Sequence, residues 1–357
     1  MNDQPIVSLI IPAYQAEKTI GRTLESATSW KGDGLEIIVV DDGSTDLTTT
    51  LLHDAASQDD RIVLVSQANK GRSAARNAGI ACAKARWVMF LDSDDLLMPG
   101  WDDTVKQTAN AKGDLLVFSY RYGYTQISLE GRSDSGSPVE DACIDSSEMK
   151  QFLIDGSFPN GINNPRLYEW NSCWARLYRN ETVQKIMELT SGEPFPLGIR
   201  FSEDRIFNLT FVSNMEDPSI RFFSNILYYW DLGSSSTVSS IRPQDARTVI
   251  PFSSAVARLQ LDKESAGKLL AAEVLARFRT TSRLPASQLP KAAKTWGDLL
   301  STHEISHSIP FIPRIQEGRL WVNRLPVFGI THNLRFLALL YWHVVYKLVD
   351  LIGAPKK

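Results

Sequence analysis

Three carboxylates lie within four positions at the end of an apolar stretch, and they are the side chains of this sequence best suited to chemistry. The run from Arg86 to Leu91 leads directly into Asp92, Ser93, Asp94 and Asp95. Such a run predicts a buried strand, and open α/β sheets bind ligands beyond the carboxyl ends of their strands. Like charges this close repel one another, so a cation or hydrogen-bond donors must compensate them.

Alternation along an extended segment decides which of these oxygens can converge. Asp92 and Asp94 point to one side, and Ser93 and Asp95 point to the other. The resulting D-x-D pair offers hard oxygen ligands, which suit Mg²⁺ or Mn²⁺ bound by one or two carboxylates together with the phosphates of a substrate. The alternative is a solvated acidic loop, since acidic turns are common where strands end.

Composition excludes several classes of protein. The chain has 357 residues, 43% of them hydrophobic and 22% charged, which fits about two ordinary globular domains. A net charge of -3 is not that of a general nucleic-acid binder. Its cysteines, Cys82, Cys143 and Cys173, are too widely spaced to indicate a disulfide framework or a zinc ribbon. No basic leader or long apolar segment precedes residue 6, so we expect a cytoplasmic protein.

Strands and helices alternate along the first 120 residues. The strands are apolar throughout and should therefore be covered on both faces, which predicts a doubly wound, mostly parallel α/β sheet. We expect residues 126–145 to form a loop, a helix to open near Glu203 and a strand at 220–230. Beyond about Arg242 the sequence predicts a separate helical extension. The first predicted strands are 6–11, 35–40, 61–65, 87–91 and 115–120, and the first helices are 20–30, 47–52 and 73–85.

Five short motifs occur in order over the first 100 or so residues. They are Ser8–Tyr14, Glu36–Asp46, Asn69–Gly71, Ala75–Gly79 and Phe90–Asp95. Together they resemble glycosyltransferase family 2, of the capsule, exopolysaccharide and lipopolysaccharide type. The resemblance implies a GT-A fold, with a Rossmann-like nucleotide-binding half at about 1–120 and an acceptor half at about 121–240 in a domain 1–240, followed by the helical extension 241–357. It also implies inverting sugar transfer from a nucleotide-diphosphate sugar, with a UDP-sugar favoured, to a glycan or lipid-linked glycan acceptor.

The resemblance assigns roles to individual donor-site residues. Asp94 would hold the Mn²⁺ or Mg²⁺ ion that bridges the donor diphosphate. The expected nucleotide-sugar contacts are Pro12, Ala13 and Tyr14 around the nucleoside, Asp42 on the nucleobase, Arg76 beside the nucleotide, and Asp92 with Ser93 on the ribose side. Gln15, where the family often has Asn, and the segment 26–30, which lacks the usual Gln, depart from the pattern and affect the donor loop.

The second half of the chain matches the family more weakly. The segments 174–178, 202–208 and 228–230 resemble its acceptor side. By similarity Asp204 would be the general base, with Glu203 as the reserve candidate. Asp95 is a further acceptor-side candidate. The aromatic residues Tyr168, Trp170 and Trp174 suit stacking on sugar rings, and the alternative is that they belong to the core.

Three other interpretations of these motifs remain. A haloacid-dehalogenase-type phosphatase would carry D-x-D after its first strand rather than its fourth, and no later G-D-x-x-x-D occurs here. A non-catalytic GT-A binding module would be expected to lack acids that this chain retains, among them Asp42, Asp94 and Asp204. The segment 303–307 is literally H-E-x-x-H, a zinc-protease motif, but Ser308 and Pro310 leave little room for a helix, so two exposed histidines are the favoured interpretation.

The C-terminal segment 334–352 predicts an amphipathic helix. Either this helix docks on the rest of the protein, or it lies on the inner face of a membrane with Trp342 and basic residues near anionic lipid. His343, Lys347 and Asp350 fall on the polar face. The apolar face comprises Phe336, Leu337, Leu340, Tyr341, Val344, Leu348, Leu351 and Ile352.

Overall fold

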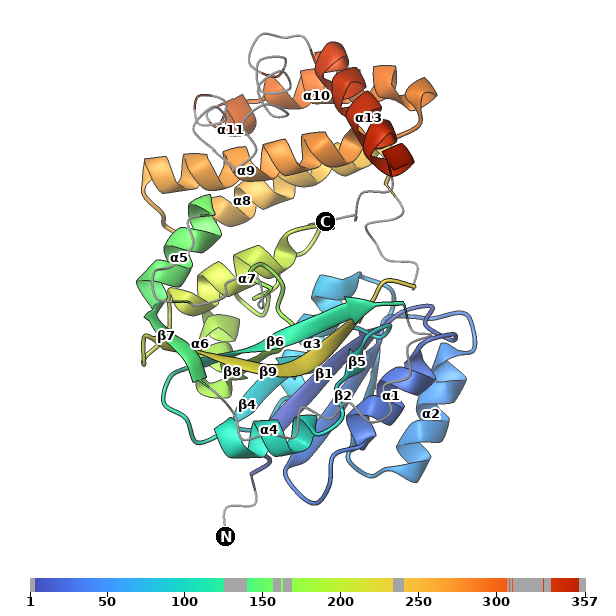
Figure 1. Cartoon of the computed structure of the whole chain (residues 1–357), viewed down its shortest axis with the longest axis vertical. Helices are drawn as coiled ribbons and strands as arrows, with labels where there is room; N and C mark the ends of the chain where they lie inside the picture. Colours follow the sequence, from blue (N-terminus) through green and yellow to red (C-terminus); the bar gives the residue numbers. More distant parts are fainter. Residues whose placement is uncertain are drawn as a thin grey trace. The chain divides into compact units, whose positions relative to one another are not determined.

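The structure is a computed structural model that describes residues 4–124, 140–156, 162, 169–233, 241–306, 308, 310, 330 and 335–352. The chain forms two compact units (Figure 1). The first comprises Met1–Phe152, Phe158–Leu197 and Glu203–Ser234, and the second comprises Leu153–Ser157, Gly198–Ser202 and Ser235–Lys357. The division into domains 1–240 and 241–357 stays a prediction, because compactness alone does not show independent folding.

Within the described residues, nine strands form one mixed sheet in the first unit. Their order is β3-β2-β1-β4-β8-β6-β9-β5, and β7 pairs with β9. Strands β3, β2, β1 and β4 are parallel to one another, whereas β8 is antiparallel to both β4 and β6. The strands are β1 Val7–Ala13, β2 Leu35–Asp41, β3 Ile62–Ser66, β4 Trp87–Phe90, β5 Leu96–Leu97, β6 Leu115–Gly123, β7 Glu140–Asp145, β8 Arg176–Arg179 and β9 Ser219–Asp231.

The parallel half of the sheet follows from its apolar runs. Strands β1, β2 and β4 are buried at every position, as two covered faces require. Strand β3 lies at the sheet edge and is buried only at Ile62, so the prediction that every strand is covered on both faces is wrong there. At Gly79, helix α3 (Arg72–Cys82) comes so close to β1 that a Cβ atom would lie 2.4 Å from Ile10 Cγ2.

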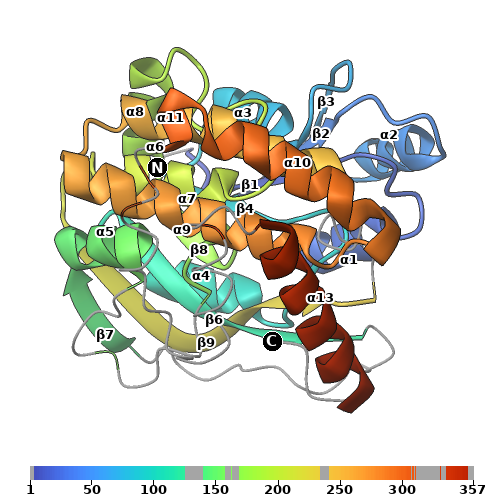
Figure 2. The same ribbon diagram turned by 90° about the horizontal axis from the view of Figure 1, so that it is seen from above.

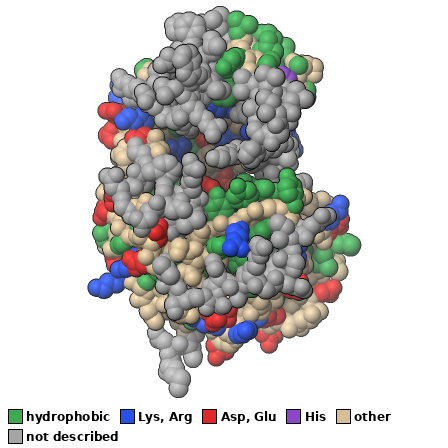
Figure 3. Space-filling model, viewed as in Figure 1, with side chains coloured by type: hydrophobic (Ala, Val, Ile, Leu, Met, Phe, Trp, Pro, Cys, Tyr) green, Lys and Arg blue, Asp and Glu red, His purple; other side chains and the backbone are tan. Residues whose placement is uncertain are grey.

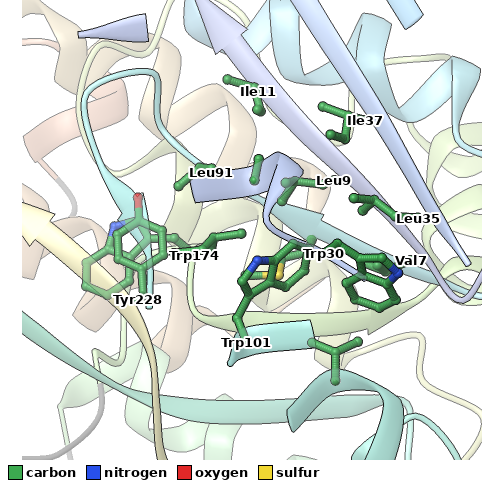
Figure 4. Packing of buried hydrophobic residues seen from close by; sticks show 14 of the residues in the cluster. Val7, Leu9, Ile11, Trp30, Leu35, Ile37, Leu91, Trp101, Trp174 and Tyr228 are labelled. Atoms are coloured by element: carbon green, nitrogen blue, oxygen red, sulfur yellow. The ribbon is translucent and has the colours of Figure 1, made fainter. Parts of the chain in front are cut away.

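Aromatic residues fill the core beside the parallel strands. Trp30 and Trp101 have their ring centres 4.8 Å apart, and Trp174 stacks on Tyr228 at 4.5 Å (Figure 4). Trp30 follows α1 (Ile20–Thr28), and Trp101 begins α4 (Trp101–Thr108). The Trp30–Trp101 contact joins α1 to α4 near the amino end of β2, and the Trp174–Tyr228 contact joins the segment before β8 to β9.

Several elements differ from the sequence-based expectation. Residues 140–145 of the expected loop form the edge strand β7, which is mostly exposed and carries no apolar alternation; residues 126–139 lie outside the described part. Strand β8, with arginine at both ends, was not predicted. The predicted helix near Glu203 is present as α7. The remaining helices of this region are α2 Thr48–Gln58, α5 Ser146–Asp155, α6 Asn180–Leu189 and α7 Glu203–Val212.

The second unit is helical in its described part, as predicted. Helices α8 and α9 run side by side (Figures 1 and 2), and α9 begins at a cap in which Asp262 accepts from the backbone N–H groups of Glu264 and Ser265. Trp296 packs on Phe278, with their ring centres 5.3 Å apart. The elements are η3 Pro243–Thr248, α8 Val249–Arg258, α9 Lys263–Thr281, η4 Ala286–Gln288, α10 Leu289–Leu300, α11 His303–Ser306 and α13 Arg335–Ile352.

The second unit also contains a short segment from the middle of the chain, Gly198–Ser202. Arg200 forms an ion pair with Asp245 at 2.8 Å. The Ser202 hydroxyl donates to Glu273 Oε2 at 2.7 Å, and Ser202 itself has a φ of 64°, a left-handed conformation that is unfavourable for residues other than glycine. Polar contacts with η3 and α9 therefore anchor this segment.

Helix α13 packs on α9 and α10 with a different face from the one predicted. Leu339 and Trp342 are buried, whereas Phe336, Leu337 and Leu340 are exposed, so the placement of Trp342 at a lipid surface is wrong. None of the helices in the described residues has the length and apolar character needed to cross a membrane. Helix α11 ends at Ser306, and His307 lies outside the described part, so only a portion of the H-E-x-x-H motif can be placed.

Two leucines of α13 test this packing. Leu339 is 0% exposed and Leu337 is 57% exposed. We expect Leu339→Ala to lower the free energy of unfolding by about 2–5 kcal/mol, because it leaves a cavity, and Leu337→Ala to change it by about 0.5 kcal/mol or less. Urea unfolding of the full chain measures both. Equal effects, or a larger effect for Leu337, would restore the face predicted from the sequence.

Candidate active site

The motif residues converge at the carboxyl ends of β1, β2 and β4. Ala13 ends β1 and pairs in register with Asp41 at the end of β2. The Asp42 backbone N–H donates to the Ala13 carbonyl at 2.8 Å, and Asp92 lies two residues beyond β4. Because parallel strands end at one edge, residues far apart in the sequence become neighbours here.

Asp42 is buried, and three hydrogen bonds fix its carboxylate. One oxygen accepts from Gln67 Nε2 at 2.7 Å and from the Lys70 N–H at 2.9 Å. The other accepts from the Gly71 N–H at 2.8 Å. Gly71 has a φ of 91°, which favours glycine at this position. A carboxylate has about four acceptor positions, so Asp42 holds the 69–71 loop and has one acceptor position beyond these three hydrogen bonds.

The loop after β1 presents one exposed aromatic ring. Pro12 and Ala13 are buried, whereas Tyr14 is 50% exposed. Gln15 has a φ of 51°. Its side-chain oxygen accepts from the Thr45 N–H at 2.7 Å, and its own N–H donates to the Ser44 hydroxyl at 3.1 Å. The departure from the family pattern at Gln15 therefore supplies hydrogen bonds between the loops after β1 and β2.

Two arginines on one face of α3 meet the acids of α7. Arg76 Nη1 lies 2.7 Å from Asp204 Oδ1, and Nη2 lies 2.7 Å from Asp92 Oδ1. Arg72, one helical turn earlier, donates from Nε to Glu203 Oε1 at 2.9 Å. Arg72 was not among the predicted site residues, although its spacing of four residues from Arg76 places both on the same side of a helix.

Burial and charge act in opposite directions on these acids. Burial alone would raise the pKa of Asp92, but the guanidinium groups of Arg76 and Arg72 outweigh it and hold the pKa below its usual value. Burial raises the pKa of Glu203 in spite of Arg72. The Glu203 side chain is 2% exposed and that of Asp204 is 16% exposed. Of the two neighbouring acids, Asp204 is therefore the more accessible.

Side chains of α1 donate hydrogen bonds to backbone carbonyls of the D-x-D turn. Arg22 Nη2 donates to the Asp94 carbonyl at 3.0 Å, and the Thr23 hydroxyl donates to the Ser93 carbonyl at 3.0 Å. Asp92, Ser93 and Asp94 are all partly exposed and Asp95 is buried. The segment is a turn, in which the Asp95 N–H donates to the Asp92 carbonyl at 3.1 Å, so the alternation predicted for an extended segment is wrong here.

Asp92 and Asp94 of this turn are the candidate ligands for a divalent ion. Among the described residues, no group of three or more His, Cys, Asp or Glu side chains is placed to hold a metal. The partly exposed carboxylates of Asp92 and Asp94, two residues apart, suit an ion whose remaining ligands come from substrate phosphates and water. The residues present therefore fit a substrate-completed site rather than an all-protein cage.

The expected acceptor contacts lie in the interior instead. Asp95 Oδ2 accepts from the Tyr228 hydroxyl at 2.6 Å, and Oδ1 accepts from the Asp231 N–H at 2.8 Å. Burial, together with the nearby acids of the turn, raises the pKa of Asp95 to about 8. Trp170 and Trp174 are 5% and 6% exposed and pack on other aromatic rings, so the core alternative holds for both; Tyr168 lies outside the described residues.

Charged side chains of both signs are interspersed over the described part of the face in Figure 3. They do not gather there into one basic patch of the kind that binds nucleic acid.

Comparisons with known proteins agree with the motif pattern. The family model described as "Glycosyl transferase family 2" matches residues 8–185. Glycosyltransferase GlyG of Streptococcus pneumoniae is 32% identical over 234 residues, which are 65% of this chain and 72% of that protein. Putative glycosyltransferase EpsH of Bacillus subtilis is 28% identical over 66% of this chain, and the succinoglycan biosynthesis protein ExoO of Rhizobium meliloti is 38% identical over 36%. The chain spans 63% of EpsH and 36% of ExoO.

Solved structures share the fold. The structure of S. aureus TarS 1–349 in complex with UDP-GlcNAc has a TM-score of 0.62 and 18% identity, and it covers 96% of this chain and 91% of that one. TarS 1–349 determined without a named ligand has a TM-score of 0.59 at 17% identity, with the same coverage. At these identities the likeness shows the fold alone.

Two adjacent aspartates test the hydrogen bonds that hold the 69–71 loop. In Asp42→Asn the amide NH₂ must face the backbone N–H of either Lys70 or Gly71, whichever way it turns. In Asp41→Asn the oxygen can face the Ser44 N–H while the NH₂ faces the Thr49 hydroxyl, which can accept. We expect Asp42→Asn to cost about 1–3 kcal/mol in urea unfolding without nucleotide, and Asp41→Asn to cost less. The reverse order would contradict the loop-holding contacts of Asp42.

Proposed function

This chain belongs to glycosyltransferase family 2, and we propose that it transfers a sugar with inversion from a nucleotide-diphosphate sugar to a glycan or lipid-linked glycan. We favour a UDP-sugar donor, since the fold is shared with a protein that binds UDP-GlcNAc. The name of ExoO, a succinoglycan biosynthesis protein, supports a polysaccharide acceptor. The observation that carries the proposal is the meeting of the D-x-D acid Asp92 and the α7 acid Asp204 on Arg76.

In this proposal the donor lies along the carboxyl ends of β1, β2 and β4. Tyr14 offers an exposed ring to the nucleoside, and Asp42 offers its remaining acceptor position to the nucleobase. Asp92 and Ser93 face the ribose side. Asp94 would hold Mg²⁺ or Mn²⁺, which when bound neutralises charge on the departing diphosphate.

Asp204 takes the proton from an acceptor hydroxyl in this proposal. The hydroxyl oxygen forms a bond to the anomeric carbon on the face opposite the nucleotide diphosphate, whose bond to that carbon breaks with both electrons. One base suffices for such a displacement. Glu203 is less suited to the role, since its side chain is 2% exposed and paired with Arg72.

The nucleotide should bind in a manner that depends on Asp94. We expect Asp94→Ala to abolish the Mn²⁺-dependent part of UDP affinity in calorimetry while leaving the melting temperature nearly unchanged, because the side chain is partly exposed. Asp103→Ala, at an exposed acid of α4, is the matched control. Parent-like UDP affinity of Asp94→Ala in Mn²⁺ would remove the metal role.

Replacement of Asp204 tests the chemistry. A panel of nucleotide-sugars, followed by release of the nucleoside diphosphate, identifies the donor. With that donor we expect Asp204→Asn to lower transfer by about 10²–10⁴-fold, as loss of a general base does, with UDP affinity and melting temperature nearly intact. Loss of transfer in Glu203→Gln but not in Asp204→Asn would move the base by one residue. No turnover by the parent with any donor would favour the non-catalytic binding module.

We further propose a peripheral lipid contact through α13. Its exposed apolar residues Phe336, Leu337, Leu340 and Val344 support this contact, which would bring the enzyme to a lipid-linked acceptor. Flotation with anionic vesicles should recover the parent chain with lipid and lose the Leu337→Ser/Leu340→Ser variant. Equal recovery of both away from the vesicles would remove the proposal.

A further inference from the structure

Arg76 lies in the interior of the first unit, whereas the family resemblance places it beside the nucleotide. Its side chain is 1% exposed, and the Phe195 ring centre lies 5.2 Å from Cζ. Nη2 contacts Asp92 and Nη1 contacts Asp204, each at 2.7 Å. A nucleotide could reach the guanidinium group only if the packing around this side chain, or one of its ion pairs, opened.

Acids from two separate elements share this one guanidinium. Asp92 follows β4, and Asp204 lies in the first turn of α7. Arginine presents its N–H groups in a rigid planar fork, so pairing with both acids fixes the distance and the orientation between them. A lysine ammonium keeps the charge but lacks this fork. The bridge depends on the shape of the side chain as well as on its charge.

Arg72 offers a contrast on the same face of α3. Its side chain is 37% exposed, and it pairs with Glu203. Arg76 also approaches Glu203, but at 3.4 Å, longer than its contacts with Asp92 and Asp204. The partly exposed Arg72 therefore pairs with an acid of α7, and the buried Arg76 connects α7 to the D-x-D turn.

We propose that Arg76 is a positioning residue that does not touch the nucleotide and that fixes Asp204 relative to the donor-side acid Asp92. This inference rests on the proposed function, in which Asp92 faces the donor and Asp204 is the base. Arg76 then affects donor binding through Asp92 and the rate of transfer through Asp204. A direct nucleotide ligand would act independently of both acids.

Two double-mutant cycles with Arg76→Lys separate these roles. In the first cycle, UDP affinity in Mn²⁺ is titrated for Arg76→Lys, Asp92→Asn and the double variant. In the second cycle, kcat is measured for Arg76→Lys, Asp204→Asn and their double variant, with UDP-GlcNAc hydrolysis or transfer from the identified donor as the reaction. We expect Arg76→Lys alone to lower kcat at least tenfold. We also expect it to change UDP affinity less than threefold once Asp92 is Asn, and kcat less than threefold once Asp204 is Asn. Losses that multiply in either cycle would overturn the proposal.

Guanidinium NMR of the full chain tests the bridge without turnover and with Arg76 retained. We expect the Arg76 side-chain signals to shift in both Asp92→Asn and Asp204→Asn, and to stay in place when UDP and Mn²⁺ saturate the parent. Arg61→Lys, at an arginine that pairs with Asp59, serves as the control and should leave the Arg76 signals unchanged. Signals that ignore either acid, or that move chiefly with UDP, would overturn the bridge. Failure of the parent to bind UDP would count against the proposed donor, while the response to the two acids would still decide the bridge.

Discussion

A carboxylate that is wholly or partly removed from water is stable only when donors or cations satisfy its oxygens, and the edge of the sheet in the first unit brings together several such groups. Each is compensated differently. Backbone N–H groups and an amide satisfy Asp42, a guanidinium satisfies Asp92, and a tyrosine hydroxyl with a backbone N–H satisfies Asp95. The compensating groups come from the 67–71 loop, from α3 and from β9, so the packing of these elements is tied to the charges.

This difference in compensation separates the roles of neighbouring acids. Asp95 connects the D-x-D turn to β9 and is closed to a ligand, whereas Asp94, one residue earlier, is partly exposed. In α7, the buried Glu203 carboxylate pairs with Arg72, whereas the Asp204 side chain is partly exposed. Residues of identical chemistry thus become scaffold or candidate site according to the face on which they lie.

Local patterns predicted the parts of the fold that depend on short stretches of sequence. Apolar runs suffice for β1, β2 and β4, and the acidic start of α7 marks a helix that begins at Glu203. Strand β7 could not be predicted, because its pairing with β9 and not its own hydrophobicity makes it a strand. The buried face of α13 likewise depends on α9 and α10, which periodicity within α13 does not reveal.

In the candidate site too, short motifs predicted some features, and others depend on contacts between distant residues. Motif similarity selected Asp42, Asp92 and Asp204, and the structure brings the last two together. Motif similarity could not reveal that the Arg76 side chain is buried, because Phe195 and acids distant in the sequence surround it. For Trp170 and Trp174 the residue type suited either a sugar platform or a core, and only the surrounding rings decide for the core.

The segment Gly198–Ser202 bears on how this protein can be divided and recombined. Its partners Asp245 and Glu273 lie in the helical region after residue 240, although the chain returns to the first unit at Glu203. A cut at 240 would leave Arg200 and Ser202 without those partners. An exchange of helical regions between related enzymes would have to carry residues 198–202 with it as a second, internal graft. The compact helical unit is therefore discontinuous in sequence, and a chimera designed from a linear boundary alone would lose the contacts of residues 198–202.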